Sequence, residues 1–148
     1  MRPFAPELLR GAAKFLLPIF LLFAAYLLVA GFDGPGGGFA GGAAFALAIM
    51  LYALVFGADA ARAACPAWLA RALIILGVVS FVGLGAAGVA RGYDFLDFQG
   101  LLNGPGPRTQ RFGVSIAEMC VAATTAGSLL LGFYALADRA GDMKDAEW

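Results

Sequence analysis

The sequence predicts an all-α integral membrane protein with four transmembrane helices and with the N- and C-termini both in the cytoplasm. Of its 148 residues, 61% are hydrophobic and only 14% are charged, a composition outside the range of soluble domains. Four apolar runs are long enough to cross the hydrocarbon core of a bilayer, which takes about 20 helical residues. Lysine and arginine are spread unevenly over the segments between the runs, and this asymmetry sets the orientation.

The four runs form one membrane domain that covers residues 1–148. The predicted helices are about residues 15–32, 39–57, 69–90 and 113–137. The first run follows several basic residues, an arrangement that a secretory signal also has. A cleaved signal is not expected, because Leu28 stands where a signal needs a small residue before the cleavage point, and because the run is long for a signal core.

A glycine-dense turn joins the first two runs. Residues 34–42 read Gly-Pro-Gly-Gly-Gly-Phe-Ala-Gly-Gly. Only glycine accepts positive φ at several successive positions and lets two backbones approach closely. The pairs Gly37/Gly41 and Gly38/Gly42 are each spaced four residues apart, so the turn and the start of the second helix are expected to pack tightly against a neighbouring helix.

With the N-terminus inside, seven basic residues fall on the inner side of the membrane and three on the outer side. This excess predicts that both termini are cytoplasmic. The inner group is Arg2, Arg10, Lys14, Arg62, Arg71, Arg139 and Lys144, and the outer group is Arg91, Arg108 and Arg111.

The outer loop, residues 91–112, is unusually apolar for a connection. Two acidic residues, Asp94 and Asp97, alternate with its apolar side chains. The loop is expected either to lie along the membrane interface or to dock on a partner subunit, and docking is the favoured interpretation. Its apolar residues are Tyr93, Phe95, Leu96, Phe98, Leu101 and Leu102.

Glu118 is the one acidic side chain inside a predicted span. It lies about six residues, or roughly 9 Å, from the outer end of the last helix. Ser115, Thr125 and Ser128 fall on the same side of that helix and extend it into a polar stripe. Two interpretations stay open: Glu118 lines an ion path with Ser115 and Thr125, or it bonds the last helix to a neighbouring subunit.

The sequence argues against several other functions. Cys65 and Cys120 lie too far apart in this topology to pair, and with no histidine in the chain a zinc, haem or iron–sulfur centre is not expected. The sequence shows no candidate nucleophile together with a general base, so an enzyme is not expected. A single acidic residue and no sign of inverted repeats do not make a complete transporter, so the chain is expected to be one subunit of a larger assembly.

The run from Pro35 to Gly42, placed after one apolar helix and opening the next, resembles the signature of the B subunit of Mrp-type (Mnh-type) multisubunit cation/proton antiporters. Chain length, four spans, a basic N-terminus and the apolar outer loop agree with this resemblance. The motif residues are Pro35, Gly36, Gly37, Gly38, Phe39, Gly41 and Gly42. One departure concerns the last helix, which in this family typically begins with an acid after phenylalanine, whereas this chain reads Phe112-Gly113-Val114.

The resemblance implies a non-redox, multi-pass subunit of a prokaryotic plasma-membrane complex that exchanges internal Na+ for external H+. Its implied partners are the other membrane subunits, the lipid bilayer and the transported ions; a cofactor and a nucleic acid are not expected. Such a subunit contributes to assembly and could line the ion path. The alternatives are a purely structural scaffold and the equivalent subunit of a related membrane-bound hydrogenase-type complex.

Overall fold

The computed structural model describes residues 5–31, 34–102, 104 and 106–146, with side chains described from Leu8 to Arg139 apart from the gaps. Arg2 and the side chain of Lys144, both used in the orientation argument, lie outside this part of the chain. The described residues contain helices and connecting segments. The helices are α1 (Ala5–Ala30), α2 (Gly38–Phe56), α3 (Ala58–Ala64), α4 (Ala67–Ala90), α5 (Phe98–Leu101) and α6 (Pro107–Ala146).

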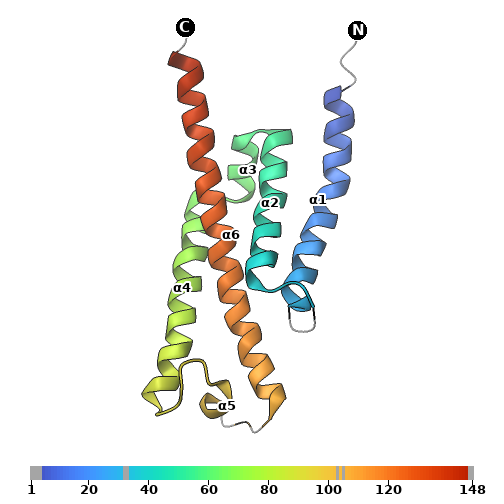
Figure 1. Cartoon of the computed structure of the whole chain (residues 1–148). Coiled ribbons are helices and arrows are strands. Elements are labelled where there is room, and N and C mark those ends of the chain that lie inside the picture. Colours follow the sequence, from blue (N-terminus) through green and yellow to red (C-terminus); the bar gives the residue numbers. More distant parts are fainter. Residues whose placement is uncertain (1–4, 32–33, 103, 105, 147–148) are drawn as a thin grey trace.

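Four of these helices are long and apolar enough to cross a membrane: α1 from Leu8, α2, α4, and α6 as far as Arg139. The predicted all-helical fold with four spans is therefore confirmed. Figure 1 shows that α1 begins and α6 finishes at the same end of the molecule, which we call the terminal end. The α1–α2 turn and the connection from α4 to α6 lie toward the opposite end, which we call the loop end.

The helices extend beyond the apolar runs that predicted them. Helix α1 begins at Ala5 rather than near residue 15, and α6 runs from Pro107 to Ala146 rather than from 113 to 137. Backbone hydrogen bonding continues wherever the residues favour a helix, and Ala, Glu, Leu, Arg and Lys do so whether or not the segment is apolar. Proline at the first position of α6 suits a helix start, because that residue needs no hydrogen-bond donor.

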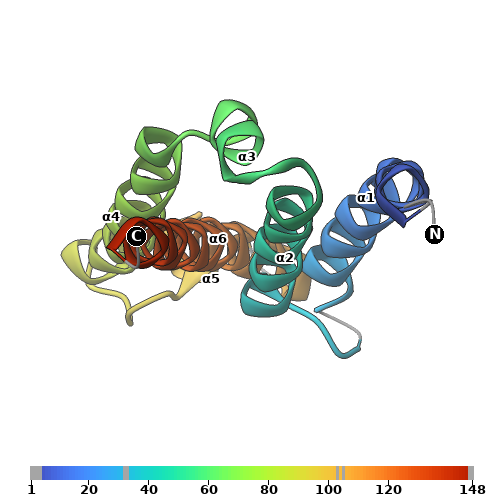
Figure 2. The same ribbon diagram turned by 90° about the horizontal axis from the view of Figure 1, so that it is seen from above.

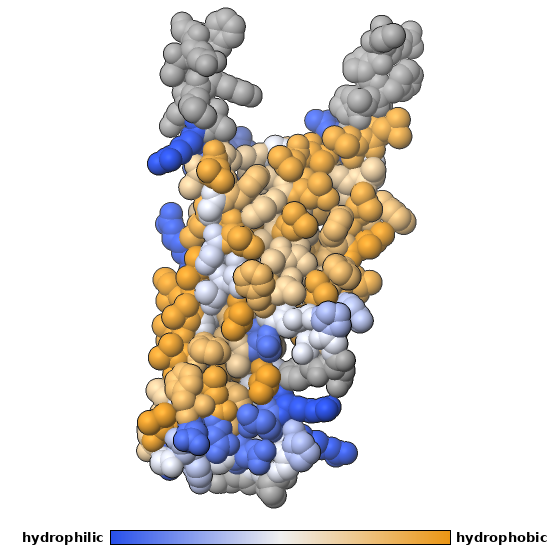
Figure 3. Space-filling view, viewed as in Figure 1, coloured by the Kyte–Doolittle hydropathy of each residue, from blue (hydrophilic) through white to orange (hydrophobic). Residues whose placement is uncertain are grey.

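The four long helices stand in a row rather than in a closed bundle. Helix α6 packs against both α4 and α2, and α1 packs mainly against α2. Figure 2, looking down the helices, shows the order α4, α6, α2 and α1, with α3 joining α2 to α4 on one side. A row leaves two broad faces uncovered, and Figure 3 shows that the face in view is largely apolar.

The core of the row lies toward the terminal end and is built from small residues and a few large ones. Leu130 of α6 is fully buried together with Ala46 of α2 and Ala70 of α4. Tyr134, 4% exposed, donates a hydrogen bond to the carbonyl oxygen of Cys65 at 2.7 Å, and the carbonyl oxygen of Ala61 lies 3.3 Å away. The segment between the predicted spans 39–57 and 69–90 therefore contains a short helix, α3, which is held against α6.

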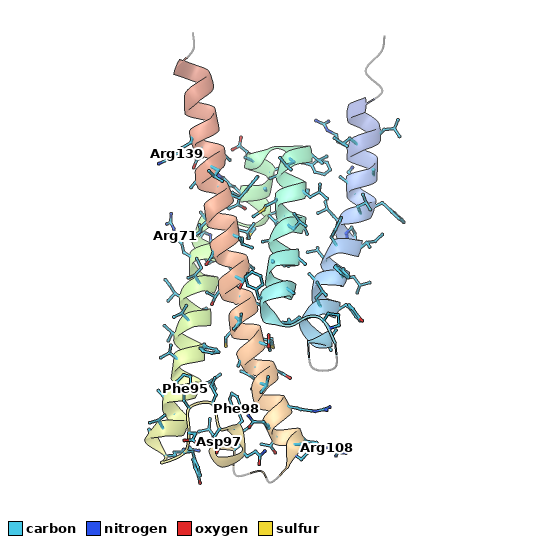
Figure 4. All side chains as sticks on the ribbon, in the orientation of Figure 1. Arg71, Phe95, Asp97, Phe98, Arg108 and Arg139 are labelled. Atoms are coloured by element: carbon cyan, nitrogen blue, oxygen red, sulfur yellow. The ribbon has the colours of Figure 1, made fainter. Side chains whose placement is uncertain are left out.

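At the loop end, aromatic rings pack against glycines of the long helices. Phe98, 2% exposed, lies against Gly113 of α6, and Phe95 lies against Gly85 of α4; Figure 4 shows both rings at this end of the two helices. Gln110 accepts a hydrogen bond from the Phe98 backbone N–H at 3.2 Å. Part of the apolar loop that was expected to dock on a partner is thus covered by its own chain, since a missing Cβ leaves room for a ring.

Candidate functional site

The glycine turn is held closely against the end of α1. Gly37 has φ 107°, a left-handed conformation that favours glycine. Its N–H donates to the carbonyl oxygen of Leu27 at 2.8 Å, and the N–H of Gly34 donates to that of Ala30 at 3.0 Å. A Cβ on Gly36 would overlap the carbonyl oxygen of Leu27. The chain therefore turns back on α1 within a space that only glycine permits.

The pair Gly38/Gly42 faces one neighbouring helix, whereas the pair Gly37/Gly41 is divided, with Gly37 at the Glu118 side chain of α6. Gly38 and Gly42 face α6: a Cβ on Gly38 would overlap the backbone oxygen of Glu118, and one on Gly42 would come within 2.9 Å of the Ala122 Cα. Gly41 faces α1, where a Cβ would lie 3.0 Å from the Cβ of Leu28. Backbones this close gain dispersion contacts that lipid cannot replace. Helix α2 is therefore packed tightly on both sides at its start.

The two motif residues with large side chains point outward. Pro35 is exposed and Phe39 is 69% exposed. They consequently contribute little to packing within the described chain, unlike the glycines around them.

Glu118 caps helix α2 from a different helix. The Glu118 side-chain Oε2 accepts a hydrogen bond from the backbone N–H of Gly38, the first residue of α2. Gly37 has no side chain with which to cap the helix itself. A helix N-terminus carries unpaired N–H groups and a partial positive charge, so a carboxylate is a favourable partner there. Glu118 thus bonds α6 to α2 inside the chain.

Ser115 and Thr125 do not join Glu118 in one site. The Ser115 hydroxyl donates to the Arg111 carbonyl oxygen of its own helix at 3.1 Å. Thr125 lines a small cavity of about 200 Å³ with residues of α4, among them Val78 and Phe81. The predicted polar stripe therefore divides between the α2 side and the α4 side of α6.

Sequence reasoning overlooked Thr124 and Ala122. Thr124 donates its hydroxyl to the Cys120 carbonyl oxygen at 2.9 Å and lies against Gly77 of α4. Ala122 supplies the surface on which Gly42 rests. The signal for Ala122 was present in the spacing, because Glu118 and Ala122 are four residues apart, as are Gly38 and Gly42, and one matched pair predicts the other.

The Glu118–Gly38 contact lies deep in the row of helices. Glu118 is eleven residues into α6, about 16 Å from its start at 1.5 Å per residue. On the other side of α6, Gly77 packs at Cys120 and Thr124, which places this level near the middle of α4. Figure 1 shows the same relation, with the α1–α2 turn well short of the loop-end termini of α4 and α6.

Positive partial charge, a basic residue and an apolar cavity surround the Glu118–Gly38 contact. The α2 N-terminus contributes positive partial charge, and Arg111 lies two turns along the same face of α6. One turn inward, the space between α1, α2 and α6 is a cavity of about 430 Å³ with an almost wholly apolar lining, including Ala24, Gly41 and Ala126. Chemically, the Glu118 carboxylate can hold two helices together, and the surroundings provide few other groups for an ion.

The terminal end holds the other notable charges. Arg62 of α3 forms an ion pair with Asp138 of α6 and lies over the Tyr134 ring, 5.5 Å from its centre. The hydrogen bond to Asp138 raises the pKa of Arg62. Burial raises the pKa of the Cys65 thiol, and Cys65 and Cys120 are both free and buried. The Arg62 contacts fasten α3 to α6, and burial leaves the Cys65 thiol poorly reactive.

Comparison with known proteins supports the resemblance drawn from the glycine turn. Residues 8–131 match the family described as a domain related to the MnhB subunit of Na+/H+ antiporter. The B subunit of the Na(+)/H(+) antiporter of Bacillus subtilis (strain 168) is 35% identical to this chain over 79 residues, which cover 51% of this chain and 55% of that relative. The chain thus matches about half the length of this relative. With four membrane-length helices and a family match over most of its length, the chain is a multi-pass plasma-membrane protein that belongs to the MnhB family.

Proposed function

We propose that this chain is a non-redox membrane subunit of a multisubunit antiporter that exchanges Na+ for H+. The family match and the similarity to the B subunit of a known antiporter support this assignment. The arrangement of the helices supports it as well. A single row with two broad uncovered faces, of which the one in Figure 3 is largely apolar, suits a chain whose neighbours in the membrane are other subunits rather than lipid alone.

Within the complex, Glu118 fixes the position of the α1–α2 hairpin along α6. The surfaces that meet there are Gly38 and Gly42 on α2 and Ala122 on α6. Small, smooth surfaces allow helices to slide past each other, whereas one buried polar contact specifies a register. The hydrogen bond between Glu118 and Gly38 is the single observation that carries this role. The glycine motif and Glu118 therefore act as one positioning element, and the transported ions pass through other subunits.

The termini are assigned to the cytoplasm in this proposal. The described basic residues of the terminal end, including Arg62, Arg71 and Arg139, outnumber those of the loop end, and basic residues are enriched on the cytoplasmic side. Figure 4 shows Arg71 and Arg139 toward the terminal end of their helices and Arg108 at the loop end.

Purification of the intact complex tests the assignment of function. An affinity tag on this chain should recover other antiporter subunits, and vesicles that contain the complex should show sodium-dependent proton flux. Recovery of nickel or iron–sulfur subunits would support the hydrogenase-type alternative. Recovery of no other membrane subunit would contradict both.

Substitution of Glu118 tests its role in the same preparation. Glu118→Gln keeps an oxygen that accepts from Gly38, so complex yield and flux should stay close to wild type. Glu118→Ala leaves the Gly38 N–H without that acceptor, a loss of about 1–3 kcal/mol, and should lower the yield. Ser128→Ala, at an exposed position on the same helix, is the control. Normal yield with lost flux in Glu118→Gln would instead place Glu118 in the ion path.

A further inference from the structure

An apolar groove lies between α4 and α6 and opens to the outside of the chain. Its deepest part is the cavity of about 200 Å³ already described, lined by Val78, Phe81 and Val82 of α4 and by residues of α6 that include Val121 and Thr125. Val78 is 46% exposed and Val82 is 53% exposed, so the cavity is not part of the core. We call this feature the α4–α6 groove. Its lining suits a hydrocarbon chain.

Two arginines lie on the same face as the α4–α6 groove, toward the terminal end. Arg71 precedes Val78 by seven residues and Val82 by eleven, a spacing that keeps all three on one face of α4. Arg139 follows Val121 by eighteen residues, which is five turns at 3.6 residues per turn, so both lie on one face of α6. Figure 4 shows Arg71 and Arg139 on the same side of the row of helices.

The directions of the two helices turn these arginines toward each other. Side chains of a helix lean toward its N-terminus. Helix α4 begins at the terminal end and α6 finishes there, so Arg71 leans toward that end and Arg139 leans away from it. Gly127 of α6 rests on the Ala70 carbonyl oxygen, which places Arg71 about twelve residues, or roughly 18 Å, below Arg139 along α6. Two long side chains converging across this interval suit a headgroup better than a single small ion.

The charges at this level identify the kind of headgroup. Arg71 and Arg139 are exposed, and no described carboxylate pairs with either, since Asp138 is paired with Arg62. Trp68, 67% exposed, stands one turn before Arg71, and tryptophan is enriched where the membrane meets water. Exposed arginines at this depth attract anionic phospholipids. The complement of the pair is therefore a phosphate group.

We propose that the α4–α6 groove binds an anionic phospholipid, with the phosphate between Arg71 and Arg139 and one acyl chain in the cavity. Val78 and Val82 lie about 10–16 Å from Arg71 along α4, which agrees with the hydrocarbon depth of one leaflet, about 15 Å. A phospholipid carries an anion and an apolar chain at this separation in one molecule, whereas a docked helix supplies only the apolar part. The inference goes beyond the proposed function and requires no partner subunit.

The headgroup is tested with the full chain in detergent by native mass spectrometry, during titration with dioleoyl phosphatidylglycerol or dioleoyl phosphatidylcholine. The chain should retain phosphatidylglycerol at concentrations at which phosphatidylcholine is not bound. Arg71→Gln and Arg139→Gln should each weaken this binding about fivefold, the factor expected for one basic residue near an anionic headgroup. Arg108→Gln, at an exposed arginine near the other end of α6, should leave the affinity unchanged. Equal binding of the two lipids, or equal loss in all three variants, would overturn the proposal.

The acyl chain is tested in the same titration. Val82→Phe and Val78→Phe should narrow the α4–α6 groove and weaken the binding of phosphatidylglycerol. Val79→Phe is the control, because Val79 is 62% exposed on α4 and does not line the cavity. Thermal midpoints without added lipid separate loss of binding from loss of folding. In the assembled complex, a photo-crosslinking residue at position 78 should label phospholipid, and a crosslink to another subunit instead would show that protein fills the groove and would overturn the proposal.

Discussion

Glu118 and Gly38 are 80 residues apart in the chain, and one hydrogen bond between them joins the last long helix to the start of the second. This bond sets how far the α1–α2 hairpin extends along α6. The depth of the glycine turn along α6 follows from that position.

Gly38→Ala should weaken the chain, because the added methyl group would overlap the backbone oxygen of Glu118 and push α2 away from α6. Gly83→Ala is the matched control, since Gly83 also lies inside a long helix but faces open space. Alanine favours a helix over glycine by roughly 1 kcal/mol, so the control should be neutral or stabilising. For each variant, the thermal midpoint of the purified complex and its yield from membranes are measured. Equal midpoints and equal yields for the two variants would contradict tight packing at Gly38.

Gly113→Ala should displace the Phe98 ring, because the new methyl group would occupy the place of that ring. The expected result is a loop end that is digested faster by an added protease, with little change in the membrane spans. Gly132→Ala, at a glycine of the same helix with nothing nearby, is the control. Similar protease resistance in both variants would show that the ring does not hold the loop.

Tyr134→Phe should lower the thermal midpoint of the chain by a few degrees. The change removes the hydroxyl that bonds the Cys65 carbonyl oxygen in a buried site, and an unsatisfied buried acceptor costs about 1–3 kcal/mol. Tyr26→Phe is the comparison, because Tyr26 is 63% exposed and lies on α1. An unchanged midpoint for Tyr134→Phe would mean that this bond does not fasten α3 to α6.

Cys65 should react slowly with a maleimide, because burial raises the pKa of its thiol and only the thiolate attacks. At a given pH a thiol with a raised pKa has a smaller thiolate fraction. Labelling of Cys65 should therefore accelerate at a higher pH than labelling of an ordinary cysteine. A Cys120→Ser background isolates Cys65, and Ala64→Cys with Cys65→Ser provides an exposed neighbour for comparison. The measurement is the labelling rate of both thiols in detergent, followed by mass spectrometry from about pH 7 to 10, a range around the ordinary cysteine pKa of about 8.5. Equal rates for the two thiols at every pH would contradict the prediction.

The orientation predicts which engineered thiols an impermeant reagent reaches in intact cells. In a chain without native cysteines, Leu102→Cys at the loop end should be labelled from outside, and Ala64→Cys at the terminal end should not. Both positions are exposed in the structure, so the side of the membrane should decide access. Labelling of Ala64→Cys alone would reverse the assigned orientation.

The fold class, the number of spans and the family could all be predicted from the amino-acid sequence. These depend on local properties, because an apolar run of sufficient length crosses a bilayer whatever surrounds it, and a glycine turn is a contiguous motif. The same reasoning singled out Glu118 and the glycine pairs. Helices α1 and α6 extend well beyond the expected spans, and α3 lies in a segment between two of them, since apolarity marks the membrane and not the extent of backbone hydrogen bonding.

The contacts of these residues became evident only from the packing of the helices. Ser115, Glu118 and Thr125 share a side of α6 in sequence, yet α2 and α4 divide that side between them, so Thr125 meets α4 while Glu118 meets Gly38. The aromatic residues of the outer loop likewise pack against glycines of the same chain, Phe95 on Gly85 and Phe98 on Gly113. Small-residue surfaces are compatible with many helix registers, and the choice among them depends on contacts between segments far apart in the chain, which no local pattern records.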